Sequence, residues 1–264
     1  MVRHQEVAKG LRILLEDTRI DTDIPAKKLI MMQEKFLQSH QDLFSDEEKE
    51  FVRYYLRASI YKFYLANLSL EQLWALSVNK RFELFDAIKN SLDSLDCSDD
   101  ELLLISLSFE EFLFIARSFL DFYMLYICIF IPTGHRGKIS RKIFFKALAN
   151  VKEPYLEKAE AISAYFDTNV FGSSEFGDWN PKNWGTLLIS LRDKIAHRDI
   201  IRPSFDSDET LAQDILFNWP TLQGTTYERF CQYIGNGIFT MLRDVSPILY
   251  ELEWKAGPPR PGLW

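Results

Sequence analysis

The sequence predicts an all-α protein, and three observations support this fold class. Apolar residues recur at three- and four-residue spacings through most of the chain, which is the period of an amphipathic helix. No run of any length alternates between apolar and polar residues, as a half-buried strand does. Glycine (11) and proline (10) make up about 8% of the 264 residues, against an average of roughly 12%. The chain therefore has few of the turns that an all-β fold needs.

The predicted helices begin and end at recognisable signals. Ser45–Glu48, Ser69–Gln72 and Ser108–Glu111 each fit the capping box, in which serine and Glu or Gln side chains bind backbone N–H groups at a helix start. Pro132–Gly134 and Pro203 follow predicted helix ends, because proline cannot continue a helix. The helical segments are 7–15, 26–37, 45–67, 69–92, 108–131, 140–150, 154–166, 187–198 and 225–252.

Composition divides the chain into three parts. Residues 93–101 hold five acidic and few apolar residues, so we expect a surface connection there. It separates an N-terminal helical region, 1–100, in which no motif indicates a role, from a helical domain, 101–254. A flexible tail, 255–264, follows, and 170–184 is the main predicted loop.

We expect a soluble, cytoplasmic protein. The N-terminus becomes polar almost at once, which does not fit a signal peptide. The most apolar segment, Phe112–Ile131, includes Arg117 and Asp121, and its uncharged run is ten residues, whereas a membrane span needs about 18. The segment therefore predicts a core helix and no membrane span. Three widely spaced cysteines suit a reducing compartment and exclude a disulfide scaffold: Cys97, Cys128 and Cys231.

Charge is unevenly distributed along the chain. The net charge of −7 gives no general sign of nucleic-acid binding. Residues 132–203, however, contain twelve Lys and Arg against eight Asp and Glu. Such a basic region attracts a polyanion such as RNA locally, although the same charges also fit a solvated helix face. The candidate RNA-binding residues are Arg141, Lys142, Lys194 and Arg198.

The familiar metal and nucleotide motifs are missing from the sequence. Gly134–Lys138 lacks the first glycine and the Ser or Thr of a phosphate-binding loop. The histidines are scattered and have no cysteine partners at zinc-site spacing: His4, His40, His135 and His197. The sequence therefore predicts neither a metal nor a cofactor.

One segment, Leu191–Asp199, carries a pattern that suits catalysis. On a helix, Asp193 and His197 lie on one face and Arg192 on another, all away from an apolar stripe through Leu191. Only the long side chain of Arg192, or a second chain across a symmetric interface, can bring it to His197. Asp193 and His197 are one turn apart, so the carboxylate can fix the imidazole tautomer. His197 can then act as a general acid or base, and Arg192 can bind a phosphate through its planar fork. This chemistry suits cleavage of RNA without a metal, with the 2′-hydroxyl as nucleophile.

The same residues also fit a structural role. A histidine late in a helix stabilises the helix dipole, and Arg192 with Asp193 can be a surface ion pair. Arg117 and Asp121 lie one turn apart in an apolar helix, where charged side chains are costly unless partnered. This pair either satisfies itself or faces the helix of Arg192 and positions its side chains.

Together these segments resemble the HEPN superfamily (higher eukaryotes and prokaryotes nucleotide-binding). Arg192-x4-His197 is similar to its R-x(4–6)-H signature, and Ala116–Asp121 resembles the first-helix motif of many bacterial members. The resemblance covers residues 108–252 and implies an up-and-down four-helix bundle, often a dimer with both signatures at the interface. It also implies, in active members, a metal-independent endoribonuclease. Arg192 and His197 then match the catalytic pair, Asp193 the polar position after the arginine, and Asp121 the acidic residue of the first helix.

Three hypotheses follow from the sequence. The first is an RNA-cleaving homodimer of a toxin or defence system, which an antitoxin or another defence protein binds. The second is a catalytically inactive helical module that binds RNA, a nucleotide or a protein partner. The third is a helical scaffold without a site. They differ in whether Arg192 and His197 converge on a groove that solvent reaches.

Overall fold

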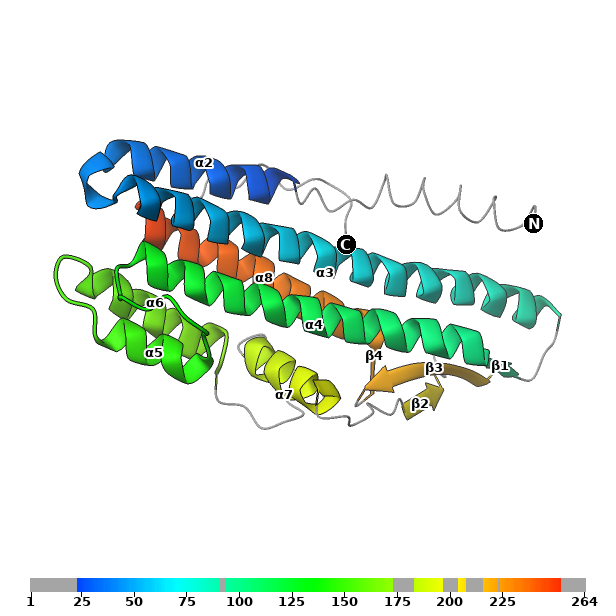
Figure 1. Ribbon diagram of the computed structural model, residues 1–264. Coiled ribbons are helices and arrows are strands. Elements are labelled where there is room, and N and C mark those ends of the chain that lie inside the picture. The colour runs from blue at the N-terminus through cyan, green and yellow to red at the C-terminus, as the bar shows by residue number, and fades with distance from the viewer. Residues whose placement is uncertain are drawn as a thin grey trace.

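The structure, a computed structural model, describes residues 23–90, 94–172, 183–196, 204–207, 216–222 and 224–252. Most of this part of the chain is helical, which confirms the predicted predominance of α-helix (Figure 1). In chain order the elements are α2 (Asp23–Ser39), η1 (Gln41–Leu43), α3 (Asp46–Lys89), β1 (Ser94–Asp96), α4 (Asp99–Phe130), α5 (Arg141–Ala149), α6 (Leu156–Asn169), α7 (Trp184–Ala196), β2 (Ser204–Ser207), β3 (Leu216–Leu222), β4 (Thr225–Thr226) and α8 (Tyr227–Tyr250).

Two long helices, α3 and α4, lie side by side and antiparallel (Figure 1). Near the end of α3, Lys80 Nζ donates to both carboxylate oxygens of Glu101 on α4, at 3.2 and 2.9 Å. Further along the pair, the rings of Phe63 and Phe119 pack with their centroids 5.8 Å apart. The two contacts show that the two helices run in opposite directions. The pair forms the frame against which the other helices pack.

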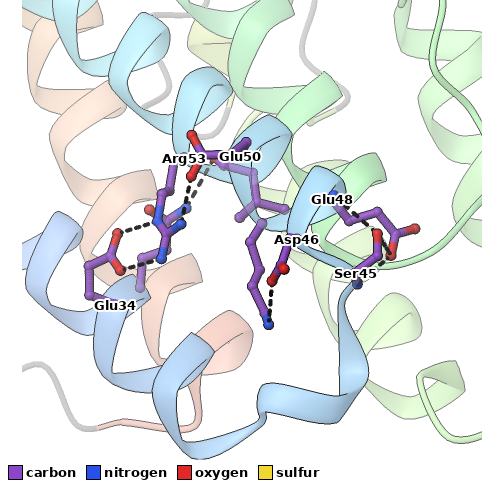
Figure 2. A network of polar contacts seen from close by, with 9 residues as sticks. Glu34, Ser45, Asp46, Glu48, Glu50 and Arg53 are labelled. Atoms are coloured by element: carbon purple, nitrogen blue, oxygen red, sulfur yellow. Dashed lines mark hydrogen bonds and ion pairs between the residues drawn. The ribbon is translucent and has the colours of Figure 1, made fainter.

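The first predicted capping box is confirmed at the start of α3. The backbone N–H of Ser45 donates to Glu48 Oε2 at 3.0 Å, and the Glu48 N–H donates to Ser45 Oγ at 3.3 Å (Figure 2). The hydrogen bond from the Ser45 backbone holds the pKa of Glu48 below its ordinary value. This reciprocal pair satisfies backbone donors that have no partner within the helix.

The other two predicted helix starts are wrong, because Ser69 lies inside α3 and Ser108 inside α4. Helix α4 begins instead after Ser98, whose hydroxyl accepts the N–H of Glu101 in a complete capping box. Both interior serines are buried, and Ser108 Oγ donates to Gln72 Oε1 on α3 at 3.3 Å. The apolar contact of α3 with α4 outweighs the local capping pattern, so each helix continues past its false start.

Arg53 joins α2 to α3. Its Nε and Nη2 donate to the two carboxylate oxygens of Glu34 on α2, at 2.9 and 3.0 Å (Figure 2). Its Nη1 donates to Glu50, one turn earlier on α3, at 2.8 Å. A bidentate contact of this kind is geometrically specific. It therefore fixes where α2 lies along α3.

The core lies around α4, whose last residues, 126–130, are all buried. A polar link crosses this core, because Gln33 of α2 donates to Tyr126 of α4 at 3.4 Å, and Tyr126 bonds to Tyr250 of α8 at 2.6 Å. One cluster of buried side chains includes Leu29 and Leu56, before residue 100, together with residues of α4 and α8. The core thus extends across the predicted boundary at residue 100.

Helix α4 is also long and apolar enough to cross a membrane by length and composition alone. However, 61% of its most apolar window is buried against the rest of the protein. The core helix of a soluble protein meets the same criterion, so this single helix is weak evidence for a membrane span.

A small sheet beside the N-terminal end of α4 was not predicted (Figure 1). Its central strand β3 pairs with β1 in parallel and with β2 and β4 antiparallel. The strands have two to seven residues, and β3 contains Pro220, which lacks an N–H donor. Such short strands leave no clear alternation in the sequence. Because β1 lies in the connection between α3 and α4, the sheet ties that connection to the chain entering α8.

The other described helices match the sequence prediction to within a few residues: α2, α5, α6, α7 and α8. Ser140 caps α5 through a 3.3 Å hydrogen bond from the Ile143 N–H. The predicted helix 7–15 and tail 255–264 lie outside the described residues. Most of the predicted loop 170–184 also lies outside them.

Candidate functional site

Helix α7, which carries the segment containing Arg192, packs against α4 and α8 (Figure 1). Its apolar side is buried, as the helical pattern predicts, through Trp184, Leu188 and Leu191. Gly237 of α8 admits the Trp184 ring, because a Cβ at position 237 would lie 2.6 Å from that ring. This close fit positions the first turn of α7 on α8.

Arg192 and Asp193 lie near the end of α7, at the protein surface. Arg192 Nη1 donates to Asp193 Oδ1 at 3.0 Å. The guanidinium carbon of Arg192 lies 5.6 Å from the ring centroid of Phe114 on α4, within the range of a cation–π contact. The side chains of Arg192 and Asp193 are 38% and 48% exposed. A ligand in solution can therefore reach both of them.

Arg117 and Asp121 lie one turn apart on α4 and form an ion pair. Arg117 Nη2 is 2.9 Å from Asp121 Oδ1. The two side chains are 12% and 34% exposed, so this pair lies deeper than Arg192 and Asp193. Although the distance is short, the angles are not those of a hydrogen bond, since Asp121 Oδ1 is left without a hydrogen-bond partner.

These four residues form one cluster, which we call the α4–α7 charge cluster: Arg117, Asp121, Arg192 and Asp193. Burial raises the pKa of Asp121 to about 6, against the opposing effect of the positive charges of Arg117 and Arg192, while the charge of Asp193 adds to the rise. Burial also lowers the pKa of Arg117, which remains protonated at neutral pH. The two segments singled out in the sequence therefore lie together in space.

Three buried atoms of the cluster have no hydrogen-bond partner in the described part of the chain: Arg117 Nη1, Asp121 Oδ1 and Arg192 Nε. Other buried charged groups are well bonded. Lys80 donates to two glutamates, and Glu228 accepts from Ser77 at 2.9 Å and from Trp219 at 3.1 Å. A buried polar group without a partner costs about 1–3 kcal/mol, and more if it is charged. The cluster is therefore where the described chain leaves charged groups incompletely bonded.

Two of the predicted site residues, His197 and Arg198, lie outside the described residues. The expected contact between Asp193 and His197 therefore stays a prediction. Lys194, between the two halves of the signature, is exposed on α7.

Arg141 and Lys142 lie on α5, away from the cluster. Both are exposed, and the Arg141 guanidinium lies over the Phe171 ring at 4.9 Å. Phe171 marks the N-terminal end of α7, because its carbonyl accepts the Thr186 hydroxyl at 3.2 Å. Arg192 is near the opposite end of this helix, about 10 Å further along at ~1.5 Å per residue. The structure thus separates these two basic residues from the cluster.

Phe114 is a site residue that the sequence analysis missed. It lies three residues before Arg117 on α4, so the two share one helix face. An aromatic residue one turn from a charged pair was the available signal. Nothing in the sequence, however, indicated that Arg192 would stack on it, because that contact joins two distant segments.

Within the described part of the chain, no three His, Cys, Asp or Glu side chains gather as a metal site requires. Comparisons with protein families, curated proteins and solved structures found no match for this chain.

Proposed function

We propose that this protein is a cytoplasmic, metal-independent endoribonuclease of the HEPN type, active in a toxin or defence system. One observation supports it above the others: the segments with Arg117 and Asp121 and with Arg192 and Asp193, far apart in the sequence, lie together on packed helices. The resemblance to the HEPN superfamily rests on these same two segments and implies a helical bundle around them.

In this proposal Arg192 binds the scissile phosphate and His197 transfers protons. The 2′-hydroxyl of the RNA attacks the phosphorus and gives its proton to a general base. The bond to the 5′-oxygen breaks, and that oxygen takes a proton from a general acid. The products are a 2′,3′-cyclic phosphate and a 5′-hydroxyl, so atoms and charges balance without a metal. A homodimer would supply a second His197, so that one imidazole serves as base and the other as acid.

The surrounding basic residues would bind the RNA backbone. Lys194 is exposed beside Arg192, and Arg198 follows it in the chain. Arg141 and Lys142 are further away on α5, where they would bind a more distant part of the strand. An antitoxin or another defence protein is the expected protein partner.

A catalytically inactive module that binds RNA, a nucleotide or a protein is the second candidate. The contacts of Arg192 favour it, because its guanidinium already bonds to Asp193 and stacks on Phe114. An arginine held in this way can serve stability or binding without catalysis.

The deciding experiment is cleavage of a labelled pool of structured RNA in EDTA by purified protein. We expect the wild type to leave 2′,3′-cyclic phosphate ends, and His197→Ala and Arg192→Ala to lose at least about 100-fold in rate. His135→Ala and Arg243→Ala are matched controls, since His135 lies in the connection between α4 and α5 and Arg243 pairs with Asp244 on α8.

Circular dichroism would show that all variants are equally folded. If the wild type binds the RNA but leaves it intact, the second candidate replaces the first. If the wild type neither binds nor cleaves RNA, both candidates fail.

A further inference from the structure

Two of the three unpartnered atoms in the α4–α7 charge cluster are guanidinium nitrogens. Arg117 Nη1 and Arg192 Nε are buried donors without an acceptor among the described residues. Asparagine, threonine and tyrosine account for the other unpartnered buried atoms in the described chain, so the unpartnered charged groups are confined to this cluster. An acceptor that reaches both guanidinium groups would remove the cost of leaving these donors unbonded.

The contacts of Arg192 leave its Nε donor unused. The hydrogen bond to Asp193 uses Nη1, at 3.0 Å, and the stacking on Phe114 uses a face of the guanidinium. The Nε–H is left without an acceptor among the described residues. In general, Nε and Nη2 of one guanidinium can bind two oxygens of one phosphate. Phe114 and Asp193 hold the guanidinium in place, which lowers the entropy lost when a ligand binds.

We propose that Arg117 and Arg192 together bind one phosphate group, with Arg117 as a direct ligand and not only a partner of Asp121. Arg192, at the exposed edge of the cluster, would meet the phosphate first, and the more deeply placed Arg117 would complete the site. The proposal rests on the proposed function in one respect, because it takes this phosphate to be part of an RNA backbone.

Charge within the cluster makes this binding depend on pH. With every group ionised, the charges of two arginines balance those of two aspartates. The cluster then has no net charge and attracts an anion only weakly. Asp121 has a pKa of about 6, so below that pH its carboxyl is neutral and the cluster carries one net positive charge. In the described chain the charged groups that act on Asp121 are Arg117 on its own helix and Arg192 and Asp193 on α7. The phosphate therefore binds more tightly at acidic pH.

The first test uses a short, fluorescent 2′-O-methyl RNA, which cannot be cleaved because it has no free 2′-hydroxyl. Fluorescence anisotropy would measure its dissociation constant near pH 5 and near pH 7.5, on either side of the Asp121 pKa of about 6. A phosphodiester keeps one negative charge over this range, so a change in affinity reports on the protein. We expect the wild type to bind about fivefold more tightly at the lower pH.

Three variants separate the proposal from its rivals. Arg117→Lys keeps the charge but removes the fork, and should weaken binding about tenfold at the lower pH. Asp121→Asn should bind more tightly than the wild type near pH 7.5, because the variant lacks the carboxylate at every pH. Arg53→Lys is the matched control, because the donors of Arg53 are bonded to Glu34 and Glu50, and its affinity should not change. An Arg117→Lys protein that is folded and binds like the wild type would overturn the proposal.

The second test needs no variant. Sulfate would be titrated into protein with ¹⁵N-labelled arginine while the Nε–H signals are followed by NMR. We expect the signals of Arg117 and Arg192 to shift together with one dissociation constant, because one oxyanion contacts both. A response of Arg192 alone would contradict the shared site. Sulfate binding without RNA binding would identify a free oxyanion as the ligand in place of an RNA phosphate.

These outcomes are distinct from those for the proposed function. If the protein binds the uncleavable RNA through Arg117 but leaves ordinary RNA intact, the phosphate site stands and the nuclease proposal fails. If it cleaves RNA and Arg117→Lys changes neither binding nor rate, the nuclease proposal stands and the shared phosphate site fails.

Discussion

Asp121 is the residue whose titration should be visible in the stability of the protein. Its folded-state pKa of about 6 lies above the ordinary value of 3.8, because burial disfavours the carboxylate. The folded state thus holds this proton more tightly than the unfolded state does. The stabilisation is present at low pH and is lost as pH rises from about 4 through about 6.

We therefore expect Asp121→Asn to flatten the pH profile of stability. From about pH 4 to pH 7, the unfolding free energy of the wild type should fall by on the order of 1 kcal/mol relative to the variant, a figure that allows for the partial exposure of Asp121. Urea unfolding at a series of pH values measures this difference. Parallel profiles for the two proteins would show that burial of Asp121 costs nothing.

Gly237 should be intolerant of even one methyl group. A Cβ there would lie 2.6 Å from the Trp184 ring, closer than packed atoms come, so Gly237→Ala should destabilise the protein by about 1–3 kcal/mol. Gly235→Ala is the matched control two residues earlier in α8, where the nearest atom would be 3.9 Å away, on Leu70. That substitution should be neutral or stabilise by up to about 1 kcal/mol, because alanine favours helix. Thermal unfolding of both variants makes the comparison, and equal effects would contradict it.

Single residues of the candidate site were predictable only where local spacing carries the information. The i,i+4 pair Arg117 and Asp121 and the polar side of α7 can be read from helical periodicity. The contact of Arg192 with Phe114 and the missing partners of the guanidinium groups depend on how α7 packs on α4. Tertiary packing of that kind leaves no local pattern in the sequence.

At the scale of elements, substituting the serine that caps α4 should lower stability more than substituting Ser69, the serine at the wrongly predicted helix start within α3. Ser98→Ala removes a capping box and should cost about 1 kcal/mol. Ser69→Ala removes only a 3.4 Å hydrogen bond to the carbonyl of Leu65 inside a helix, and should change stability by less than about 0.5 kcal/mol. Midpoints of urea unfolding compare the two. A larger loss for Ser69→Ala would mean that its buried hydroxyl has a role beyond that bond.

These serines also show why helix starts were harder to predict than helices. A capping box needs only a serine and a Glu or Gln three residues later, so the pattern also occurs inside long helices. Ser69 and Ser108 match it, yet both are buried within long helices, and Ser108 bonds to Gln72 of the neighbouring helix. Helical period correctly indicated helix through most of the described chain, whereas the points where helices begin and end depended on contacts between helices. The strands were missed for a related reason, since β1 exists only because β3 pairs with it.

For the whole molecule, we expect one cooperative unfolding transition, because one core includes residues on both sides of residue 100. Leu56→Ala, at a fully buried position of α3, should lower the stability of the entire described fold by about 2–5 kcal/mol. Calorimetry should still show one transition, shifted to lower temperature. Two transitions with only one of them shifted would instead support separate N-terminal and C-terminal units.

The predominance of α-helix was therefore predictable from composition and periodicity, and the way the helices share a core was not. The stretch Asp93–Glu101 has five acidic and few apolar residues, which predicts a surface connection and a domain boundary. Its described part includes β1 and the first turn of α4, where Glu101 binds Lys80 of α3. The core shared by residues on both sides of residue 100 depends on contacts between distant segments, which leave no local pattern in the sequence.

The fit of Trp184 against Gly237 has a consequence for the opposite end of α7. Together with the stacking of Arg192 on Phe114, it fixes both the rotation and the axial position of this helix. Adding or deleting one residue between these two contacts would turn everything beyond it by about 100°. Arg192 would then lose its contact with the ring of Phe114, while the buried start of α7 stayed in place. The number of residues between the two contacts is therefore constrained. Substitutions in this span should be tolerated far better than an insertion or a deletion.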